Sequence, residues 1–221
     1  MTGACKPAIL SAMTEDETET EKTPARRPAR HRGPRVPRKV TRQSLENAAL
    51  AYLGRFATTA KGLSDVLMRR VQRAARHHGS DPAEGAALIA AIVTRYRQAG
   101  LLDDTAFAEG RARTLFERGL PLRAIALRLR QKGVGADDVA TALARLDPDA
   151  DRDDPAAPDA RALDRAAART FARRRRLGPW RKPDTREALR ERDLATLARA
   201  GFSYGIARET IDGNMEEDEN A

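Results

Sequence analysis

The sequence predicts an all-α protein, an elongated stack of three tandem three-helix repeats with no β-sheet. Apolar residues recur at spacings of three and four along most of residues 43–213, which is typical of amphipathic helices. β-branched residues nowhere alternate with polar residues over five or more positions, as they would in half-buried strands. A glycine in an apolar setting recurs at Gly100, Gly133 and Gly201, where helices are expected to end.

The charge and the aromatic content narrow the classes of protein to which this chain can belong. It carries 41 Lys and Arg residues against 32 Asp and Glu residues, its formal net charge is +9, and its isoelectric point is near 10.4. That balance favours a polyanion or an acidic protein surface as the partner. Aromatic residues make up only 4% of the chain. This disfavours a deep aromatic-lined pocket and favours small helices that pack through alanine and leucine.

Cysteine content and hydropathy bear on the cellular compartment. Cys5 is the only cysteine, so a stable intrachain disulfide cannot form, and a reducing cytoplasm is the expected location. No apolar run reaches the roughly 18 residues that a membrane span needs. The N-terminal segment turns acidic after Thr14. We therefore expect neither a signal peptide nor a membrane span.

Proline and charge divide the chain into segments. Residues 1–42 are acidic at first and then basic and proline-rich, which predicts a disordered arm that either binds nucleic acid or keeps the protein soluble. Residues 147–159 hold six aspartates and three prolines and are expected to form a solvated linker, and residues 214–221 form an acidic tail. The helical repeats are accordingly predicted at 43–100, 101–146 and 160–213.

Apolar stripes locate the helices within each repeat, and each stripe is expected to face the core. In the first repeat the stripes are Leu45, Ala48, Ala49, Tyr52, Leu53 and Phe56, then Leu63, Val66, Leu67 and Val71, then Leu88, Ile92 and Tyr96. In the second repeat they are Leu122, Ile125 and Leu129, then Val139, Leu143 and Leu146. In the third repeat they are Leu163, Ala166, Ala167 and Phe171, then Leu189 and Leu197, and finally Ile206.

Paired aspartates follow two of the recurring glycines, as Asp103-Asp104 and as Asp137-Asp138. Because a glycine ends each preceding helix, these carboxylates stand where the next helix begins, close to free backbone N–H groups and the positive end of the helix dipole. A catalytic or metal-binding pair would not need to be duplicated, and no histidine stands at ligand spacing. We therefore predict no metal site and a structural, helix-capping role for Gly100, Gly133, Gly201, Asp103, Asp104, Asp137 and Asp138.

Basic side chains on the predicted helices are the candidates for contact with a partner. Residues 43–146 carry 16 basic and 10 acidic residues, and residues 160–208 carry 14 and 5. The sharpest cluster is the four arginines at 173–176, for which a favourable place at a helix end is the alternative explanation. The complete set of predicted contact residues is Arg69, Arg70, Arg111, Arg113, Arg118, Arg123, Arg128, Arg130, Lys132, Arg173, Arg174, Arg175 and Arg176.

Four stretches stand in the order found in a known family: "SDVLMRRV" (64–71), "GLLDDTAFAEGRAR" (100–113), "LRQKGVGADDVATAL" (129–143) and "LARAGFSYGIARETI" (197–211). They resemble the RecX family, the regulatory proteins of the RecA recombinase. The resemblance covers residues 45–212, and the basic arm, the acidic linker and the acidic tail depart from it.

The resemblance implies a stack of three three-helix repeats without a catalytic site or a cofactor. Proteins of this family bind the RecA filament on single-stranded DNA and block its growth or promote its disassembly. They thereby reduce ATP hydrolysis, strand exchange and co-protease activity in recombinational repair and the SOS response. The resemblance also implies non-specific binding to single-stranded and double-stranded DNA. We expect a cytoplasmic monomer, with the RecA filament and DNA as partners and no membrane contact.

Two other classes of function are alternatives to a regulator of RecA: a sequence-specific DNA-binding protein and an enzyme. The stretch "LRQKGVGADDVATAL" has the apolar, glycine and valine spacing of a helix-turn-helix motif, as in sequence-specific transcriptional regulators. Its aspartate pair would, however, begin the recognition helix and face DNA phosphates. An enzyme is disfavoured because no glycine-rich phosphate loop, metal-ligand cluster or nucleophile–base pair is visible.

Overall fold

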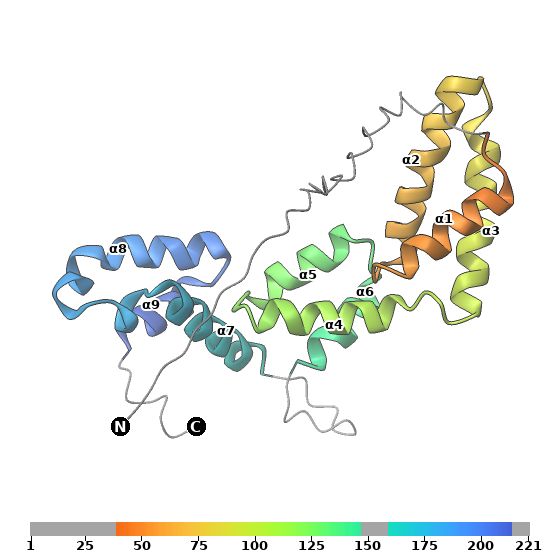
Figure 1. The fold of residues 1–221 in the computed structure, drawn as a ribbon. Coiled ribbons are helices and arrows are strands. Elements are labelled where there is room, and N and C mark those ends of the chain that lie inside the picture. The colour runs from red at the N-terminus through yellow and green to blue at the C-terminus, as the bar shows by residue number, and fades with distance from the viewer. Residues whose placement is uncertain (1–38, 147–158, 214–221) are drawn as a thin grey trace, which may run out of the picture. The chain divides into compact units, whose positions relative to one another are not determined.

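The computed structural model describes residues 39–146 and 159–213, and all regular secondary structure within these ranges is helical (Figure 1). The predicted all-α class is confirmed. Nearly all of the predicted arm, the acidic linker and the acidic tail lie outside the described residues. The described elements are α1 (Arg42–Leu53), α2 (Ala60–His78), α3 (Pro82–Gln98), α4 (Asp104–Phe116), α5 (Leu122–Gln131), α6 (Ala136–Ala144), α7 (Ala160–Arg175), the short 3-10 helix η1 (Gly178–Trp180), α8 (Pro183–Ala200) and α9 (Tyr204–Asp212).

The nine α-helices of the described residues fall into three groups of three, and each group surrounds one hydrophobic core, with Leu163 of α7 packed into the core of α4–α6. We call α1–α3 the first module, α4–α6 the second and α7–α9 the third. The largest fully buried apolar side chains are Leu45, Leu63, Leu67 and Ile92 in the first core, Leu115, Ile125 and Leu129 in the second, and Leu197 in the third. Burial of each such side chain stabilises the fold by roughly 1.5–3 kcal/mol.

Small residues allow the helices of the third module to approach one another closely. Ala168 and Ala172 on α7 are completely buried. Phe171, on the same face of α7, packs into the same core. The ring of Phe171 meets that of Phe202 edge to face, with 5.9 Å between the ring centroids. This core therefore combines one buried aromatic pair with alanines and with the leucines and isoleucines of α8, α9 and the turn after α7.

The three recurring glycines lie just past the ends of α3, α5 and α8. Their φ angles are +68° at Gly100, +82° at Gly133 and +110° at Gly201, all in the left-handed region. After Gly201, the N–H of Phe202 donates to the carbonyl of Leu197 at 3.2 Å. The chain thus turns back and seats the next apolar residue on the helix just completed.

The first apolar stripe, from Leu45 to Phe56, continues past the C-terminal end of α1. α1 ends at Leu53 and Gly54 is its C-cap, so Phe56 lies in the connection to α2. The Phe56 side chain is 52% exposed instead of facing the core. Its N–H donates to the carbonyl of Tyr52 at 2.9 Å in a turn. Helical spacing predicts which way a side chain points only within the helix. The expectation that Phe56 faces the core was wrong because Phe56 lies beyond the end of α1.

Candidate basic interface

The thirteen basic residues proposed for partner contact are all exposed. They lie on α2, α4, α5 and α7 and on the segments that follow α4, α5 and α7. Arg111 and Arg113 lie on α4, whereas Arg118 stands in the turn beyond it because α4 ends at Phe116. Several members of this set gather where one module meets the next.

Gly119 brings the turn after α4 directly against α7 of the third module. Its φ is +78°, and a Cβ at this position would lie 2.5 Å from the main-chain nitrogen of Phe171. A side chain therefore cannot be accommodated here without moving one module. Close by, the guanidinium of Arg174 donates to the main-chain carbonyl of Glu117 at 3.3 Å. The turn thus places Arg118 beside the arginine cluster of the third module.

At the junction of the second and third modules, a carboxylate from α7 caps the N-terminus of α5. Pro121 is the N-cap of α5 and provides no side-chain hydrogen bond. Asp164, on α7, instead accepts the N–H of Leu122 at 2.8 Å. Next along the chain, Arg123 lies against Gly201, where a Cβ would be 3.1 Å from its Nε. This positive side chain therefore sits at the negative end of the α8 dipole.

The four arginines at residues 173–176 differ in what they contact. The guanidinium of Arg175 lies 4.6 Å from the ring centroid of Phe171, within the range of a cation–π interaction. Arg176 ends α7 in the left-handed conformation, with φ of 53°. Within the described part of the chain, Arg173 and Arg176 are the two members of this cluster for which neither a side-chain hydrogen bond nor a ring contact is found. They are the members best placed to meet a partner.

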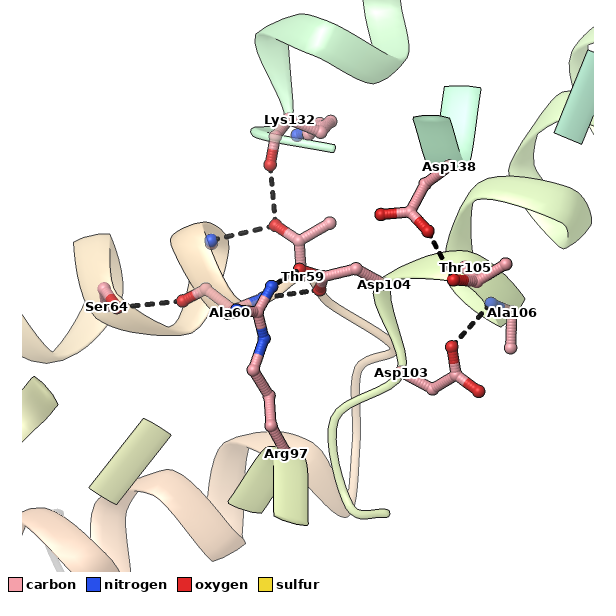
Figure 2. Close-up of polar contacts among 11 residues, drawn as sticks. Thr59, Ala60, Ser64, Arg97, Asp103, Asp104, Thr105, Ala106, Lys132 and Asp138 are labelled. Atoms are coloured by element: carbon pink, nitrogen blue, oxygen red, sulfur yellow. Dashed lines mark hydrogen bonds and ion pairs between the residues drawn. The ribbon is translucent and has the colours of Figure 1, made fainter. Parts of the chain in front are cut away.

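Asp104 joins the first and second modules rather than capping the helix that it begins (Figure 2). Its Oδ1 accepts the N–H of Ala60 at the start of α2, at 2.8 Å. Its Oδ2 accepts from the guanidinium of Arg97, at 2.6 Å. The carboxylate is buried, with the residue 8% exposed. Asp103 is the N-cap of α4, where it accepts the N–H of Ala106 at 2.8 Å, so the two neighbouring aspartates serve different helices.

The second aspartate pair does not cap α6, contrary to the prediction. Gly135 is the N-cap, and no side chain caps this helix. Asp137 and Asp138 therefore fall inside the first turn, still near the positive end of the dipole. Asp138 accepts the hydroxyl of Thr105, which ties α6 to α4 (Figure 2). The prediction failed because α6 begins two residues earlier, relative to its aspartate pair, than α4 does.

Thr59 provides a second polar link at the junction of the first two modules. Its side chain is buried, accepts the N–H of Gly62 at 3.0 Å and donates to the main-chain carbonyl of Lys132 at 2.6 Å (Figure 2). A Cβ at Gly133 would collide with the side chain of Lys61. The end of α5 is therefore held against the start of α2, and this fixes the position of the exposed Lys132.

We expect Asp104→Ala to lower the free energy of unfolding by about 2 kcal/mol, because the change leaves a buried N–H of Ala60 without its acceptor and Arg97 without its partner. Asp103→Ala is the matched control, since it removes an exposed cap and should cost about 1 kcal/mol. Urea denaturation of both variants measures the difference. Equal losses for the two variants would show that Asp104 does not link the modules.

The described residues show no sign of a metal centre or of a membrane-spanning helix. No group of three or more metal-ligating side chains is found among them. None of their helices is both long and apolar enough to cross a bilayer. What these residues do present is an all-helical protein of three modules with exposed arginines on helices of every module, of which Arg123 and Arg174 lie at the junction of the second and third modules.

Known proteins resemble this chain in sequence and in fold. A family model described as "RecX, second three-helix domain" matches residues 103–143, which include α4 and nearly all of α6. Regulatory protein RecX of Myxococcus xanthus is 46% identical over 186 residues, which cover 84% of this chain and 93% of the relative. Regulatory protein RecX of Agrobacterium fabrum is 31% identical over 174 residues, which cover 79% and 85%.

A crystal structure of a regulatory protein RecX matches the fold with a TM-score of 0.53 and 21% sequence identity, covering 78% of this chain and 72% of the other. This likeness concerns the fold, and the sequence relationship rests on the curated relatives. The chain belongs to the RecX family of regulatory proteins.

Proposed function

We propose that this protein binds the RecA recombinase filament on single-stranded DNA and limits its growth. ATP hydrolysis, strand exchange and co-protease activity of the recombinase fall as a result. The observation that carries the proposal is the exposure of all thirteen candidate basic side chains on a member of the RecX family. A filament of protein and DNA offers phosphates and acidic side chains as their counterparts.

The chemistry of the interface supports a role in binding. Arginine predominates over lysine in the candidate set, and its planar guanidinium binds phosphates and carboxylates in a bidentate manner. The junction between the second and third modules places Arg118 beside Arg174 and its neighbours. A surface built from two modules can contact two sites on a repeating filament at once, which raises the overall affinity without any new kind of contact.

The proposal predicts inhibition of the cognate RecA at low ratios of this protein. ATP hydrolysis on single-stranded DNA should fall when far less than one copy per recombinase is added, because a regulator bound at a filament end or in its groove affects many subunits. Inhibition that requires enough protein to saturate the DNA would instead indicate simple competition for DNA. Absence of inhibition at any ratio would contradict the proposal.

Charge reversal tests which surface is responsible. We expect Arg173→Glu combined with Arg176→Glu to raise the concentration needed for half-inhibition roughly tenfold, through the loss of charge complementarity. The matched control is Arg73→Glu with Arg76→Glu on α2, two exposed arginines outside the candidate set. Each double variant reverses two positive charges and changes a cation in the last turn of a helix. Equal losses in both variants would mean that only the net charge matters.

DNA binding by the protein alone separates this proposal from a sequence-specific regulator. A filament regulator should bind DNA with strong salt dependence and little sequence preference. A helix-turn-helix regulator should prefer one palindromic duplex over random DNA by several kcal/mol. Such a preference, measured by competition between duplexes, would favour the second function.

A further inference from the structure

Phe56 presents an exposed aromatic ring on the connection between α1 and α2. The chain has five phenylalanines, all within the described residues, and Phe56 is the one that is exposed, at 52%. Its ring rests against that of Tyr52, with 5.1 Å between centroids and 42° between planes. The guanidinium of Arg55 lies 5.9 Å from the centroid of the Phe56 ring. The connection between α1 and α2 thus presents a supported aromatic surface with a cation beside it.

A cavity lies beside this aromatic pair, at the junction of the first and second modules. Its volume is about 250 Å³, and Tyr52 forms part of its wall. Most of the remaining side chains on the wall are polar, and they include Thr58, Arg69, Gln131 and Lys132, while Ala57, Val66 and Phe107 are its apolar members. The main-chain carbonyl of Lys132 accepts a hydrogen bond from Thr59, so the fold fixes the backbone from which this lysine side chain extends.

The charge around the cavity is positive. Asp65 is the acidic residue on its wall, and it is paired with Lys61 at 2.7 Å. Arg69 and Lys132 on the wall are exposed, and no hydrogen bond from either side chain is found within the described part of the chain. Arg55 stands on the adjoining connection. The site therefore offers two free cations, other polar groups and the aromatic rings of Phe56, Tyr52 and Phe107.

We propose that Phe56, Tyr52 and the adjoining cavity form a stacking site for an unpaired base of single-stranded nucleic acid, with Arg69 and Lys132 holding the flanking phosphates. Every base has a π face that stacks on an aromatic side chain, so such a site is tolerant of sequence. A base pair within a duplex does not expose that face, so the site selects single strands. The inference deepens the proposed function and rests on the part of it that concerns DNA.

The composition of the wall favours a base over an apolar side chain of a protein partner. An apolar side chain would gain from an apolar pocket, whereas this wall is made largely of hydroxyl, amide and charged groups. Those groups can instead meet the polar edge of a base while the ring of Phe56 covers its face. The nearby cations add electrostatic attraction to the phosphates, which a neutral protein segment would not use.

Substitutions at Phe56 in the full chain test the site. Binding is measured by fluorescence anisotropy with labelled oligothymidylate in low-salt buffer, without recombinase. Loss of a base–aromatic stack costs about 1–3 kcal/mol, so Phe56→Leu should weaken binding on the order of tenfold. Phe56→Trp should bind at least as well as the wild type. Because Phe56 is exposed, neither change should alter the melting temperature.

Two controls separate stacking from charge. An oligonucleotide of abasic sites with the same phosphates should bind wild type and Phe56→Leu equally. Lys132→Gln should reduce the slope of log affinity against log salt by about 1, whereas Phe56→Leu should leave that slope unchanged. No binding of the wild type to oligothymidylate, or equal affinities of wild type and Phe56→Leu, would overturn the site. So would a defect of Phe56→Leu that appears only on the recombinase filament, because that result indicates a protein contact.

The same variants keep the two proposals apart. If the protein inhibits RecA while Phe56→Leu binds oligothymidylate normally, the stacking site fails and the proposed function stands. If the protein does not inhibit RecA while the Leu and Trp variants differ on oligothymidylate as described, the function fails and the site stands.

Discussion

Replacement of Asp193 by alanine is expected to lower the free energy of unfolding by about 3–5 kcal/mol, because it breaks a buried charge pair on one side only. Asp193 on α8 is 1% exposed. Its carboxylate accepts the N–H of Gly178 at 2.9 Å and two bonds from the guanidinium of Arg181, at 2.9 and 2.7 Å. Alanine would leave the Arg181 cation, itself largely covered, without its counter-ion, and would release η1 from α8.

The effect of Asp193 should depend on pH in a defined direction. Burial raises the pKa of Asp193, but hydrogen bonds from Arg181 and from Gly178 outweigh it, so the pKa lies below its ordinary value of 3.8. The charged carboxylate is favoured in the folded state, so its contribution to stability is complete above the unfolded pKa. That contribution is lost as the pH falls through the folded pKa. The stability difference between wild type and Asp193→Ala should therefore shrink in acid.

Urea denaturation at neutral pH and at the lowest pH where the wild type stays folded measures this difference. Glu191→Ala is the control, because Glu191 lies two residues away on α8, has its side chain 87% exposed, and contacts only Arg190 within the described residues. That change should leave the transition nearly unmoved. An Asp193→Ala variant as stable as Glu191→Ala, or a loss independent of pH, would contradict the account of this buried pair.

Gly119→Ala should lower the free energy of unfolding by about 3 kcal/mol. Part of this arises because an L-residue in the left-handed region costs roughly 1–2 kcal/mol, and φ at Gly119 is +78°. The remainder arises from the collision of the new methyl group with the backbone of α7 at Phe171, since overpacking typically costs about 1–3 kcal/mol. The variant should also inhibit RecA less well, because Arg118 would be displaced from the arginines of the third module.

Gly110→Ala is the matched control for Gly119→Ala. Gly110 lies within α4, its backbone is helical, and nothing stands within 4 Å of a Cβ at that position. Alanine there should stabilise the protein by about 0.5–1 kcal/mol, because it is the better helix former. Thermal melts of the two variants should therefore shift in opposite directions. A downward shift for both would mean that an added methyl group destabilises this part of the chain wherever it is placed, and would contradict a special role for the junction at Gly119.

Local features of the fold could be predicted from the sequence because they depend on neighbours along the chain. The 3–4 spacing of Leu63, Leu67 and Val71 predicted α2 and the face that it buries. A glycine next to an apolar residue indicated where α5 and α8 end, and Gly133 and Gly201 have the left-handed φ angles that such ends require. These signals involve residues less than two helical turns apart, within reach of periodicity and capping preferences.

Contacts between modules could not be predicted in the same way. Asp104 meets a residue that lies 44 positions earlier in the chain, and no pattern around Asp104 distinguishes it from Asp103. Thr59 stands just before an apolar stripe, a capping signal that could have identified its bond to Gly62 but not its bond to Lys132. The position of Phe56 was missed because a helical pattern was extended past the true end of α1.

The two cross-module carboxylates impose an order in which the protein can be completed during synthesis. Asp104 serves the start of α2 and Asp164 serves the start of α5, and in each case the second helix of one module depends on the first helix of the next. During synthesis the first module therefore lacks one of its hydrogen bonds until α4 has been made. The second module likewise lacks one until α7 has been made. A chain cut at residue 146 would leave Leu122 without its carboxylate, so the third module contributes to the integrity of the module before it as well as to the surface that the two share.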